Sequence, residues 1–328
     1  MDGVTDAAFR HIVAKYGKPS LVITEFTSVE GIRAGAERLL DDFYYSQEQR
    51  PVVAQLFGAD PSAFFIGAVV VAALGFDGID INMGCPAKNV TQKGAGAALI
   101  LDPERALSII EETKRGSAAW ANGIGLEEAG VPANLIPLIL ERRTAMGLGE
   151  ERRHLAVSVK TRIGYDRSVI IEWVKTLLES DPVAITIHGR TLKQLYTGFA
   201  DWDAIGQAAE VIHQTDTIVL GNGDVADLAD AQARIAQYGV DGVLIGRATF
   251  GNPWLFQNET ASFEERMKIA LEHARYLNAI FPGKGFIRIR KHLLDYCKGH
   301  EGAKDLRIQL MRVTCLEDVE RILAGFAA

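Results

Sequence analysis

The sequence predicts an α/β fold, a parallel (β/α)8 TIM barrel followed by a small all-helical domain. Apolar, β-branched runs alternate with amphipathic helical segments from Leu21 to about Ala248, and this alternation predicts a parallel sheet. Polar or glycine-rich residues follow nearly every predicted strand. A doubly wound sheet shows the same alternation but gathers its functional groups at one switch point, so the spread over many strand ends favours the barrel.

The predicted elements follow one another in order along the chain. Strands are expected at 21–26, 52–57, 78–83, 157–163, 184–188, 217–221 and 242–246. Helices are expected at 61–74, 103–114, 168–178, 202–212 and 227–238. Only seven strands are visible, so the missing one would have to be the first, and Met1-Asp2-Gly3-Val4 resembles the end of a strand whose body is absent. We therefore expect a barrel with a truncated first strand.

Two segments depart from the repeat. Residues 116–153 are longer than a barrel connection needs and contain an apolar helix-like stretch, Ala133–Leu140, which indicates a peripheral insert. Residues 263–326 show only helical periodicity after Asn252-Pro253-Trp254. The sequence thus predicts a catalytic barrel domain at 1–258 and a helical domain at 259–328.

Composition excludes several classes of protein. With 328 residues, 48% hydrophobic and 23% charged, the chain can bury one large core and a small second domain. No run reaches the ~18 apolar residues of a membrane span, and the first residues lack the features of a signal peptide. Cys85, Cys297 and Cys315 have no CxxC spacing, which supports neither a disulfide framework nor a zinc site. We expect a cytoplasmic monomer without a metal or a membrane attachment.

Charge is unevenly spread along the chain. The net charge of −7 argues weakly against nucleic acid as a partner. From Glu264 to the end, however, 12 Lys and Arg face 9 Asp and Glu, and within Lys284–Arg312 the numbers are 8 and 3. The sequence therefore predicts a local basic surface in the helical domain.

The most informative segment is Gly78-Ile-Asp-Ile-Asn82-Met-Gly-Cys85-Pro86. Its alternating apolar residues predict a strand, so Asn82 and Cys85 fall at the carboxyl end, where loops of α/β folds carry chemistry. A single cysteine is most often a small buried apolar residue. Polar groups at the ends of the other strands favour a functional role for this one.

Other strands carry polar side chains of the same kind. Lys160 lies in an otherwise apolar strand, either paired with a carboxylate or acting as a fixed cation beside an electron-rich ring. His188 ends the next strand and has a structural alternative as well. Gln55 is an amide inside a buried-type strand and must have a partner, which a cofactor with hydrogen-bonding ring edges would supply.

Two glycine-rich turns follow the last two predicted strands, Gly221-Asn222-Gly223-Asp224 and Gly246-Arg247. In barrels the loops after strands 7 and 8 commonly bind phosphate, since glycines let backbone N–H groups approach the anion and an arginine adds charge. One such turn is weak evidence, but two at successive strand ends favour a phosphate site.

At this point the chain resembles a known family, the tRNA-dihydrouridine synthases. The most specific matches surround Cys85 and His188, and the details around Cys85 look most similar to the bacterial B-type branch. The matching segments are GVTDAAFR (3–10), VAQLFG (53–58), GIDINMGCPAKNV (78–90), VSVKTRIG (157–164), ITIHGRTLKQLYTGFADW (185–202), LGNGD (220–224), DGVLIGRATFGNPWLF (241–256) and RKHLLDYCKG (290–299).

The resemblance implies an FMN-dependent barrel that reduces the C5=C6 bond of particular uridines in tRNA, with NADPH (or NADH) as reductant. Hydride would pass from flavin N5 to C6, and Cys85 would donate the proton to C5. The resemblance also assigns positions to the cofactor and the substrate. Flavin contacts would be Met1, Asp2, Gln55, Lys160 and His188, with Asn222, Gly223, Asp224, Gly246 and Arg247 on the phosphate side; Asn82 and Arg162 would line the uracil pocket, and Arg290 and Lys291 would contact tRNA.

This chemistry agrees with the residue types. A thiol of ordinary pKa, about 8.5, is mainly protonated at pH 7 and can donate a proton, and a lysine stabilises the anionic edge of a reduced flavin. The family's first strand normally precedes the segment that opens here at Met1, which leaves the support of Met1 and Asp2 open. Two other functions stay open, an FMN barrel of the dihydroorotate or enoate type acting on a small molecule, and a degenerate RNA-binding barrel without activity.

Overall fold

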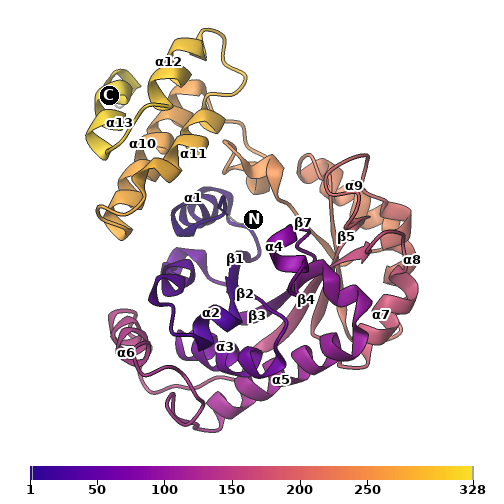
Figure 1. Ribbon diagram of the computed structural model, residues 1–328. Helices are drawn as coiled ribbons and strands as arrows, with labels where there is room; N and C mark the ends of the chain where they lie inside the picture. The colour runs from indigo at the N-terminus through magenta and orange to yellow at the C-terminus, as the bar shows by residue number, and fades with distance from the viewer. Residues whose placement is uncertain (2, 327–328) are drawn as a thin grey trace. The chain divides into compact units, whose positions relative to one another are not determined.

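A computed structural model describes residues 1 and 3–326, which form two compact units (Figure 1). We call the first the sheet unit, made of residues 23–44 and 51–245. The second, which we call the helical unit, is made of residues 1–22, 45–50 and 246 onward. Residues 1–22 thus group with the C-terminal helices. The division into a barrel domain at 1–258 and a helical domain at 259–328 stays a prediction.

The sheet has seven strands whose spatial order follows the chain order. They are β1 (Val22–Ser28), β2 (Val52–Phe57), β3 (Gly78–Met83), β4 (Ala156–Gly164), β5 (Ala184–Thr191), β6 (Ile218–Asn222) and β7 (Gly242–Leu244). Every pair from β2 to β7 is parallel. The order shows no reversal, which is the order of a TIM barrel rather than of a doubly wound sheet.

The α/β fold with a parallel, TIM-like sheet and C-terminal helices is confirmed, and each predicted strand is present. The sheet of the described residues is open between β7 and β1. The residues before the first helix form a turn, in which the N–H groups of Val4 and Thr5 both donate to the carbonyl of Met1. No strand precedes β1 in the described chain.

Helices follow the strands because aspartates and prolines start them where the pattern predicts. Asp60, Asp102, Asp201 and Asp227 each cap a helix by accepting a hydrogen bond from a backbone N–H in its first turn. The helices and 3-10 turns of this unit are α2 (Val29–Arg33), η1 (Glu37–Phe43), α3 (Pro61–Ala73), α4 (Lys88–Thr91), η3 (Gly96–Leu101), α5 (Pro103–Ala121), α6 (Ile136–Ala145), α7 (Ile170–Leu178), α8 (Trp202–Ile212) and α9 (Leu228–Tyr238).

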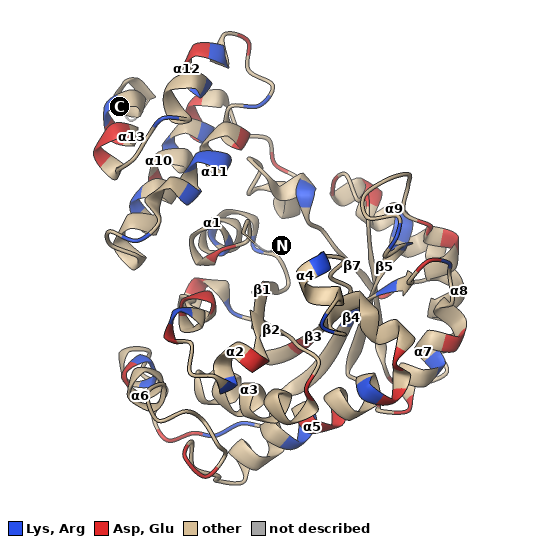
Figure 2. Ribbon diagram, in the orientation of Figure 1, with Lys and Arg blue, Asp and Glu red and all other residues tan. Residues whose placement is uncertain are grey.

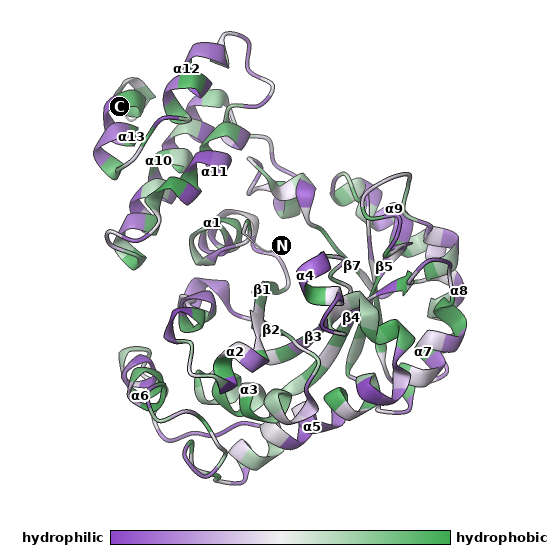
Figure 3. Ribbon diagram, in the orientation of Figure 1, coloured by the Kyte–Doolittle hydropathy of each residue, from purple (hydrophilic) through white to green (hydrophobic). Residues whose placement is uncertain are grey.

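The helices surround one face of the sheet, with α3 packed on α5, α5 on α7, α7 on α8 and α8 on α9 (Figure 1). Helix α3 is apolar along most of its length, as Figure 3 shows, because it is covered by α2, α5 and α6 as well as by the sheet. Apolar side chains of odd-numbered β3 and β4 residues, such as Ile79, Ile81 and Val159, are fully buried. The polar residues Asp80, Asn82, Ser158, Lys160 and Arg162 of the same strands lie on the other face.

The segment at 116–153 differs from the predicted insert at its start. Helix α5 continues to Ala121, so Gly116 is helical, and a Cβ there would lie 2.9 Å from the Cβ of Ala68 on α3. Glycine lets the two helices approach each other closely. The inserted helix is α6, whose Arg142 and Arg143 donate to the carbonyls of Leu40 and Ala73.

The helical unit is built around α10 (Phe263–Ile280), which packs on α1 (Ala7–Gly17), α11 (Ile289–Tyr296) and α13 (Leu316–Leu323). Ser262 and Glu265 form a capping box that starts α10. Glu272 on α10 accepts hydrogen bonds from Lys15 and Tyr16 of α1, which ties the two helices together. The other elements are η2 (Gln47–Gln49), η4 (Arg247–Thr249), η5 (Leu255–Gln257), η6 (Phe286–Arg288), α12 (Ala303–Leu310) and η7 (Ala324–Phe326).

None of the helices described here has the length and hydropathy that crossing a membrane requires.

Candidate active site

Parallel pairing brings polar residues of the sheet unit together in rows. The side chains alternate along each strand, so residues paired across neighbouring strands point to the same face. The paired residues are Gln55 with Asp80, Asn82 with Lys160, Arg162 with His188, and His188 with Asn222. Seven side chains from five strands thus share one face of the sheet near its carboxyl edge.

Cys85 is held in place by the side chain of Asn82. The Oδ1 atom of Asn82 accepts hydrogen bonds from the backbone N–H of Gly84, at 3.0 Å, and of Cys85, at 2.9 Å. The Nδ2 group donates to Oε1 of Gln55 at 2.9 Å. Cys85 itself is 8% exposed and packs in an apolar cluster with Val90 and Ala95. The asparagine therefore fixes the turn that carries the thiol.

Gln55 has its partners within the protein. Its Nε2 group donates to Oδ2 of Asp80 at 2.7 Å, and Ser158 donates to Oδ1 of Asp80 at 2.6 Å. Asp80 is buried, and burial raises the pKa of its carboxyl, opposed by the hydrogen bonds from Ser158 and Gln55. Asp80 and Asn82 are the hydrogen-bond partners of the Gln55 amide. The burial of this amide is therefore explained without a ligand. Asp80 was not among the predicted site residues. An aspartate between two isoleucines of a buried strand could have indicated a functional residue.

Lys160 has an amide rather than a carboxylate as its direct partner. Its Nζ donates to Oδ1 of Asn222 at 3.0 Å, and Nδ2 of Asn222 donates to the carbonyl of Leu244 at 2.7 Å. Burial lowers the pKa of Lys160 to about 8, and the neighbouring Arg162 contributes to the lowering, while Asp80 opposes the shift. The ammonium is thus poorly compensated by its protein surroundings.

Arg162 connects the Cys85 turn with the loop after β5. Its Nε donates to the carbonyl of Gly84 at 2.7 Å, and Nη1 donates to the carbonyls of Thr191, at 3.1 Å, and Leu195, at 3.3 Å. Burial lowers the pKa of this guanidinium. The side chain positions two loops at once.

Arg190 is a buried residue of the site that sequence reasoning did not select. It forms an ion pair with Asp224 at 2.7 Å and donates to the carbonyls of Thr197 and Gly198. Asp224, predicted on the phosphate side, also accepts from the N–H of Ala200 at 2.8 Å. The carboxylate therefore orders the loop after β5.

That loop presents two exposed aromatic side chains. Tyr196 is 67% exposed and Phe199 is 88% exposed, although the carbonyls around them are held by Arg162 and Arg190. Large apolar side chains on an ordered loop are typical of a contact surface.

Gly223 requires its glycine for two reasons. Its φ of +125° is a conformation that residues with a side chain rarely adopt, and a Cβ would lie 2.6 Å from the Cβ of Ala200 and 3.0 Å from Cδ2 of His188. The turn after β6 therefore packs closely against Ala200 and His188.

The other predicted site residues belong to the helical unit. Gly246 follows β7 in the chain, and a Cβ on it would lie 3.3 Å from Sδ of Met1. Met1, Gly246 and Arg247 stay predictions as cofactor contacts, and Asp2 lies outside the described residues.

The predicted tRNA contacts Arg290 and Lys291 lie on α11 and are only partly exposed, and Nε of Arg290 donates to the carbonyl of Val313 at 2.8 Å. Six other basic residues of the helical unit are more exposed than these two: Lys284, Arg288, Lys298, Lys304, Arg307 and Arg312. Figure 2 shows the lysines and arginines of this unit as blue segments of the ribbon.

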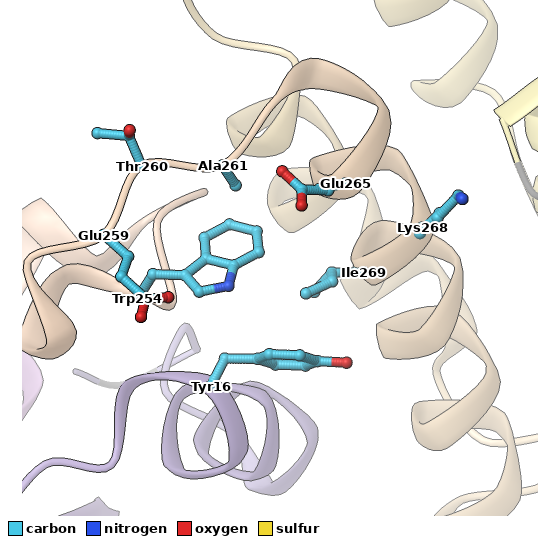
Figure 4. Close-up of a pocket in the computed structure, with 8 residues that line it drawn as sticks. All are labelled: Tyr16, Trp254, Glu259, Thr260, Ala261, Glu265, Lys268 and Ile269. Atoms are coloured by element: carbon cyan, nitrogen blue, oxygen red, sulfur yellow. The ribbon is translucent and has the colours of Figure 1, made fainter.

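A separate cavity of about 260 Å³ lies within the helical unit (Figure 4). The indole of Trp254 lies near the ring of Tyr16 on its wall, and Glu259, Glu265 and Lys268 supply its charged side chains. None of the predicted site residues lines it. The residues that do are Tyr16, Trp254, Glu259, Thr260, Ala261, Glu265, Lys268 and Ile269.

Comparison with known proteins identifies the family. The sequence profile of the family described as Dihydrouridine synthase (Dus) matches residues 1–117 and 150–326. A probable tRNA-dihydrouridine synthase of Staphylococcus aureus (strain COL) is 32% identical over 339 residues, which cover 100% of this chain and 92% of that one. Probable tRNA-dihydrouridine synthase 2 of Bacillus subtilis (strain 168) is 30% identical over 337 residues, with 99% and 92% covered.

Among solved structures, a crystal structure of DHODH from Eimeria tenella in complex with ferulenol matches with a TM-score of 0.44 and 12% identity, over 70% of this chain and 62% of that one. A likeness so distant identifies neither fold nor ligand. The profile, in contrast, spans most of the chain and includes every residue of the polar rows on the sheet. The chain belongs to the dihydrouridine synthase family of enzymes.

Proposed function

We propose that this enzyme reduces uridines of tRNA to 5,6-dihydrouridine, with FMN as the bound cofactor, NADPH as the reductant and Cys85 as the proton donor to C5. The observation that carries the proposal is the chain of hydrogen bonds from Asp80 through Gln55 and Asn82 to the Cys85 turn, with Lys160 paired beside Asn82. A buried apolar cysteine would need no such support. The network supports a thiol that must be held at one point.

The residues on the sheet fit FMN. Lys160 is a cation with an amide as its direct partner and a pKa lowered to about 8, so an electron-rich ring edge would compensate it. Gly223 lies beside His188 in the glycine-containing turn that the sequence predicts to face the phosphate. Gln55, Lys160, Asn222 and Gly223 would hold the cofactor, and bound FMN would supply hydride chemistry.

Cys85 has a defined task in this proposal. The thiol donates its proton to C5 of the uracil, while the Asn82 side chain keeps the backbone of the Cys85 turn in one conformation. Arg162 holds the same turn from the other side through the carbonyl of Gly84. Positioning from two sides limits the positions that the thiol can occupy, which favours proton transfer in one geometry.

A nucleic acid fits the surroundings better than a small molecule does. Tyr196 and Phe199 are exposed on a loop whose backbone is fixed by buried arginines, and unstacked bases bind to aromatic side chains of this kind. The basic side chains on and around α11 and α12 supply charge for phosphates. A small substrate of the dihydroorotate or enoate type would use neither feature.

The experiment is to map dihydrouridine in tRNA from a strain without its own synthases, with and without this protein. Appearance of dihydrouridine at defined positions supports the proposal. The purified protein should also show flavin absorbance and should oxidise NADPH faster when tRNA is added. Flavin without tRNA modification would favour a small-molecule enzyme, and absence of flavin would favour an RNA-binding protein without activity.

A further inference from the structure

A buried cluster in the helical unit has the composition of a metal site. Asp6 caps the N-terminus of α1, His273 lies on α10 and His292 lies on α11. Their exposed fractions are 5%, 0% and 2%. One oxygen or nitrogen from each of the three side chains lies within 4.8 Å of the others. Three segments far apart in the sequence thus converge on one point.

Each of the three side chains has a polar atom without a hydrogen-bond partner. These atoms are Oδ2 of Asp6 and Nε2 of both histidines. Buried polar atoms are nearly always bonded, because leaving one unbonded costs about 1–3 kcal/mol. Three such atoms in one cluster indicate that a group is needed to bind them together.

Other atoms of Asp6 and His273 are hydrogen-bonded, and the ring of His292 is stacked. Oδ1 of Asp6 accepts from the N–H of Phe9 at 2.9 Å, and Nδ1 of His273 is hydrogen-bonded to the hydroxyl of Tyr296 at 3.3 Å. The ring of His292 stacks on Phe9, with centroids 5.1 Å apart. Metal-binding histidines usually have the second ring nitrogen hydrogen-bonded, as that of His273 is. These contacts orient the side chains and leave one polar atom of each available to a ligand.

We propose that Asp6, His273 and His292 bind one divalent transition-metal ion, with Zn²⁺ as the first candidate. Two imidazole nitrogens and a carboxylate oxygen form a donor set of zinc sites, and a water would complete the tetrahedron. Zinc bonds of about 2.0–2.1 Å place ligand atoms about 3.3 Å apart, so the side chains need to approach each other by at most about 1.5 Å.

The ion would join α1 to α10 and α11, and none of its ligands belongs to the polar rows on the sheet. The expectation of no metal was based on the spacing of the cysteines, and this site contains no cysteine. Its ligands at 6, 273 and 292 are too far apart in the sequence to form a local motif.

The test is metal analysis of the full, untagged protein. Mass spectrometry of the purified chain should find about one equivalent of a transition metal, and Asp6→Asn and His292→Gln should each lose at least nine-tenths of it. His300→Gln is the matched control, a histidine of the same unit whose ring stacks on Phe263 outside the cluster. It should keep the wild-type metal content.

A second measurement does not depend on the variants. Wild-type protein stripped with a chelator should bind one Co²⁺ with the visible absorption of a tetrahedral site, and its unfolding temperature should rise when Co²⁺ or Zn²⁺ is added. Metal-free protein that binds no Co²⁺ would overturn the proposal in favour of a purely hydrogen-bonded cluster. Equal metal content in wild type and Asp6→Asn would overturn it as well, since the ion would then be an adventitious ion only.

Discussion

The sheet unit and the helical unit both bury polar side chains, but they satisfy them differently. On the sheet, Asp80, Gln55 and Asn82 bond to one another and to the Cys85 turn. In the helical unit, Asp6, His273 and His292 converge with one atom each left without a partner. The first arrangement is a network whose hydrogen bonds come from the protein itself, whereas the second leaves three polar atoms without partners, which the proposed ion would bind.

The difference shows how the chain builds each arrangement. The sheet network arises from register, because parallel strands align residues that the sequence places at corresponding strand ends. The cluster in the helical unit arises from packing of α1, α10 and α11, whose sequences carry no common signal. A fully hydrogen-bonded network holds a proton donor at a fixed point. A cluster with unpartnered nitrogen and oxygen atoms has the donors that a metal ion binds.

The largest effect is expected for Cys85→Ala. Uridine reduction should fall by a factor of about 100 to 10,000, the usual contribution of a general acid, while FMN stays bound and NADPH still reduces it. Single-turnover reduction of tRNA measures the first quantity and flavin bleaching measures the second. Cys315→Ala, at a partly exposed cysteine of the helical unit, is the control and should keep full activity. Unchanged turnover in Cys85→Ala would remove the thiol from the mechanism.

Lys160→Met should weaken FMN binding and slow flavin reduction, because the ring loses its cation. Removal of one preorganised electrostatic partner costs about 3 kcal/mol, or roughly a hundredfold. Fluorescence titration of free FMN and stopped-flow reduction by NADPH measure the two effects. Wild-type occupancy and wild-type kinetics in the variant would make Lys160 a structural residue only.

The lowered pKa of Lys160 also predicts the pH dependence of stability. Without FMN, the folded protein releases this proton at about pH 8, whereas the unfolded chain keeps it up to the ordinary value of 10.5. Between these values the unfolded state binds more protons, so the free energy of unfolding rises with pH. Denaturant unfolding gives the free energies of unfolding of wild type and Lys160→Met at each pH. The value for wild type minus the value for the variant should rise with pH across this range. A difference that does not change with pH would contradict the lowered pKa.

Much of the fold and part of the site could be predicted from the sequence. Strands such as Gly78–Met83 were predictable because their apolar residues alternate, and the polar residues at their ends follow from the same pattern. Hydrogen-bond partners were not predictable. Gln55 was expected to have a partner, and a cofactor was offered as that partner because the pattern does not show that register places Asp80 beside it. Arg190 was passed over because its role depends on loop carbonyls that only the folded chain brings near.

A smaller effect is expected for Asn82→Ala, which separates positioning from chemistry. The change removes the acceptor of two backbone N–H groups and a donor to Gln55, and should lower the free energy of unfolding by about 1–3 kcal/mol. Uridine reduction should slow more than flavin reduction, since the Cys85 turn is loosened. Asn134→Ala, at an exposed asparagine of the same unit, should change stability by less than about 0.5 kcal/mol. Equal losses in both variants would argue against a special role for Asn82.

The smallest effect is expected from the basic surface of the helical unit. Lys304→Glu with Arg307→Glu replaces two exposed side chains of α12, and the slope of log affinity against log salt should become shallower by about 0.7 to 0.9 for each phosphate that these side chains no longer bind. NADPH oxidation without tRNA should stay unchanged.

Arg290 is a poorer choice for this test, because it donates a hydrogen bond to the carbonyl of Val313 and a charge reversal there would also disturb packing. Lys175→Glu, at an exposed lysine on α7 of the sheet unit, is the control for a change of charge. If both units gave the same salt slope, the helical unit would have no special part in binding tRNA, and the contrast between a catalytic sheet and an RNA-binding set of helices would fail.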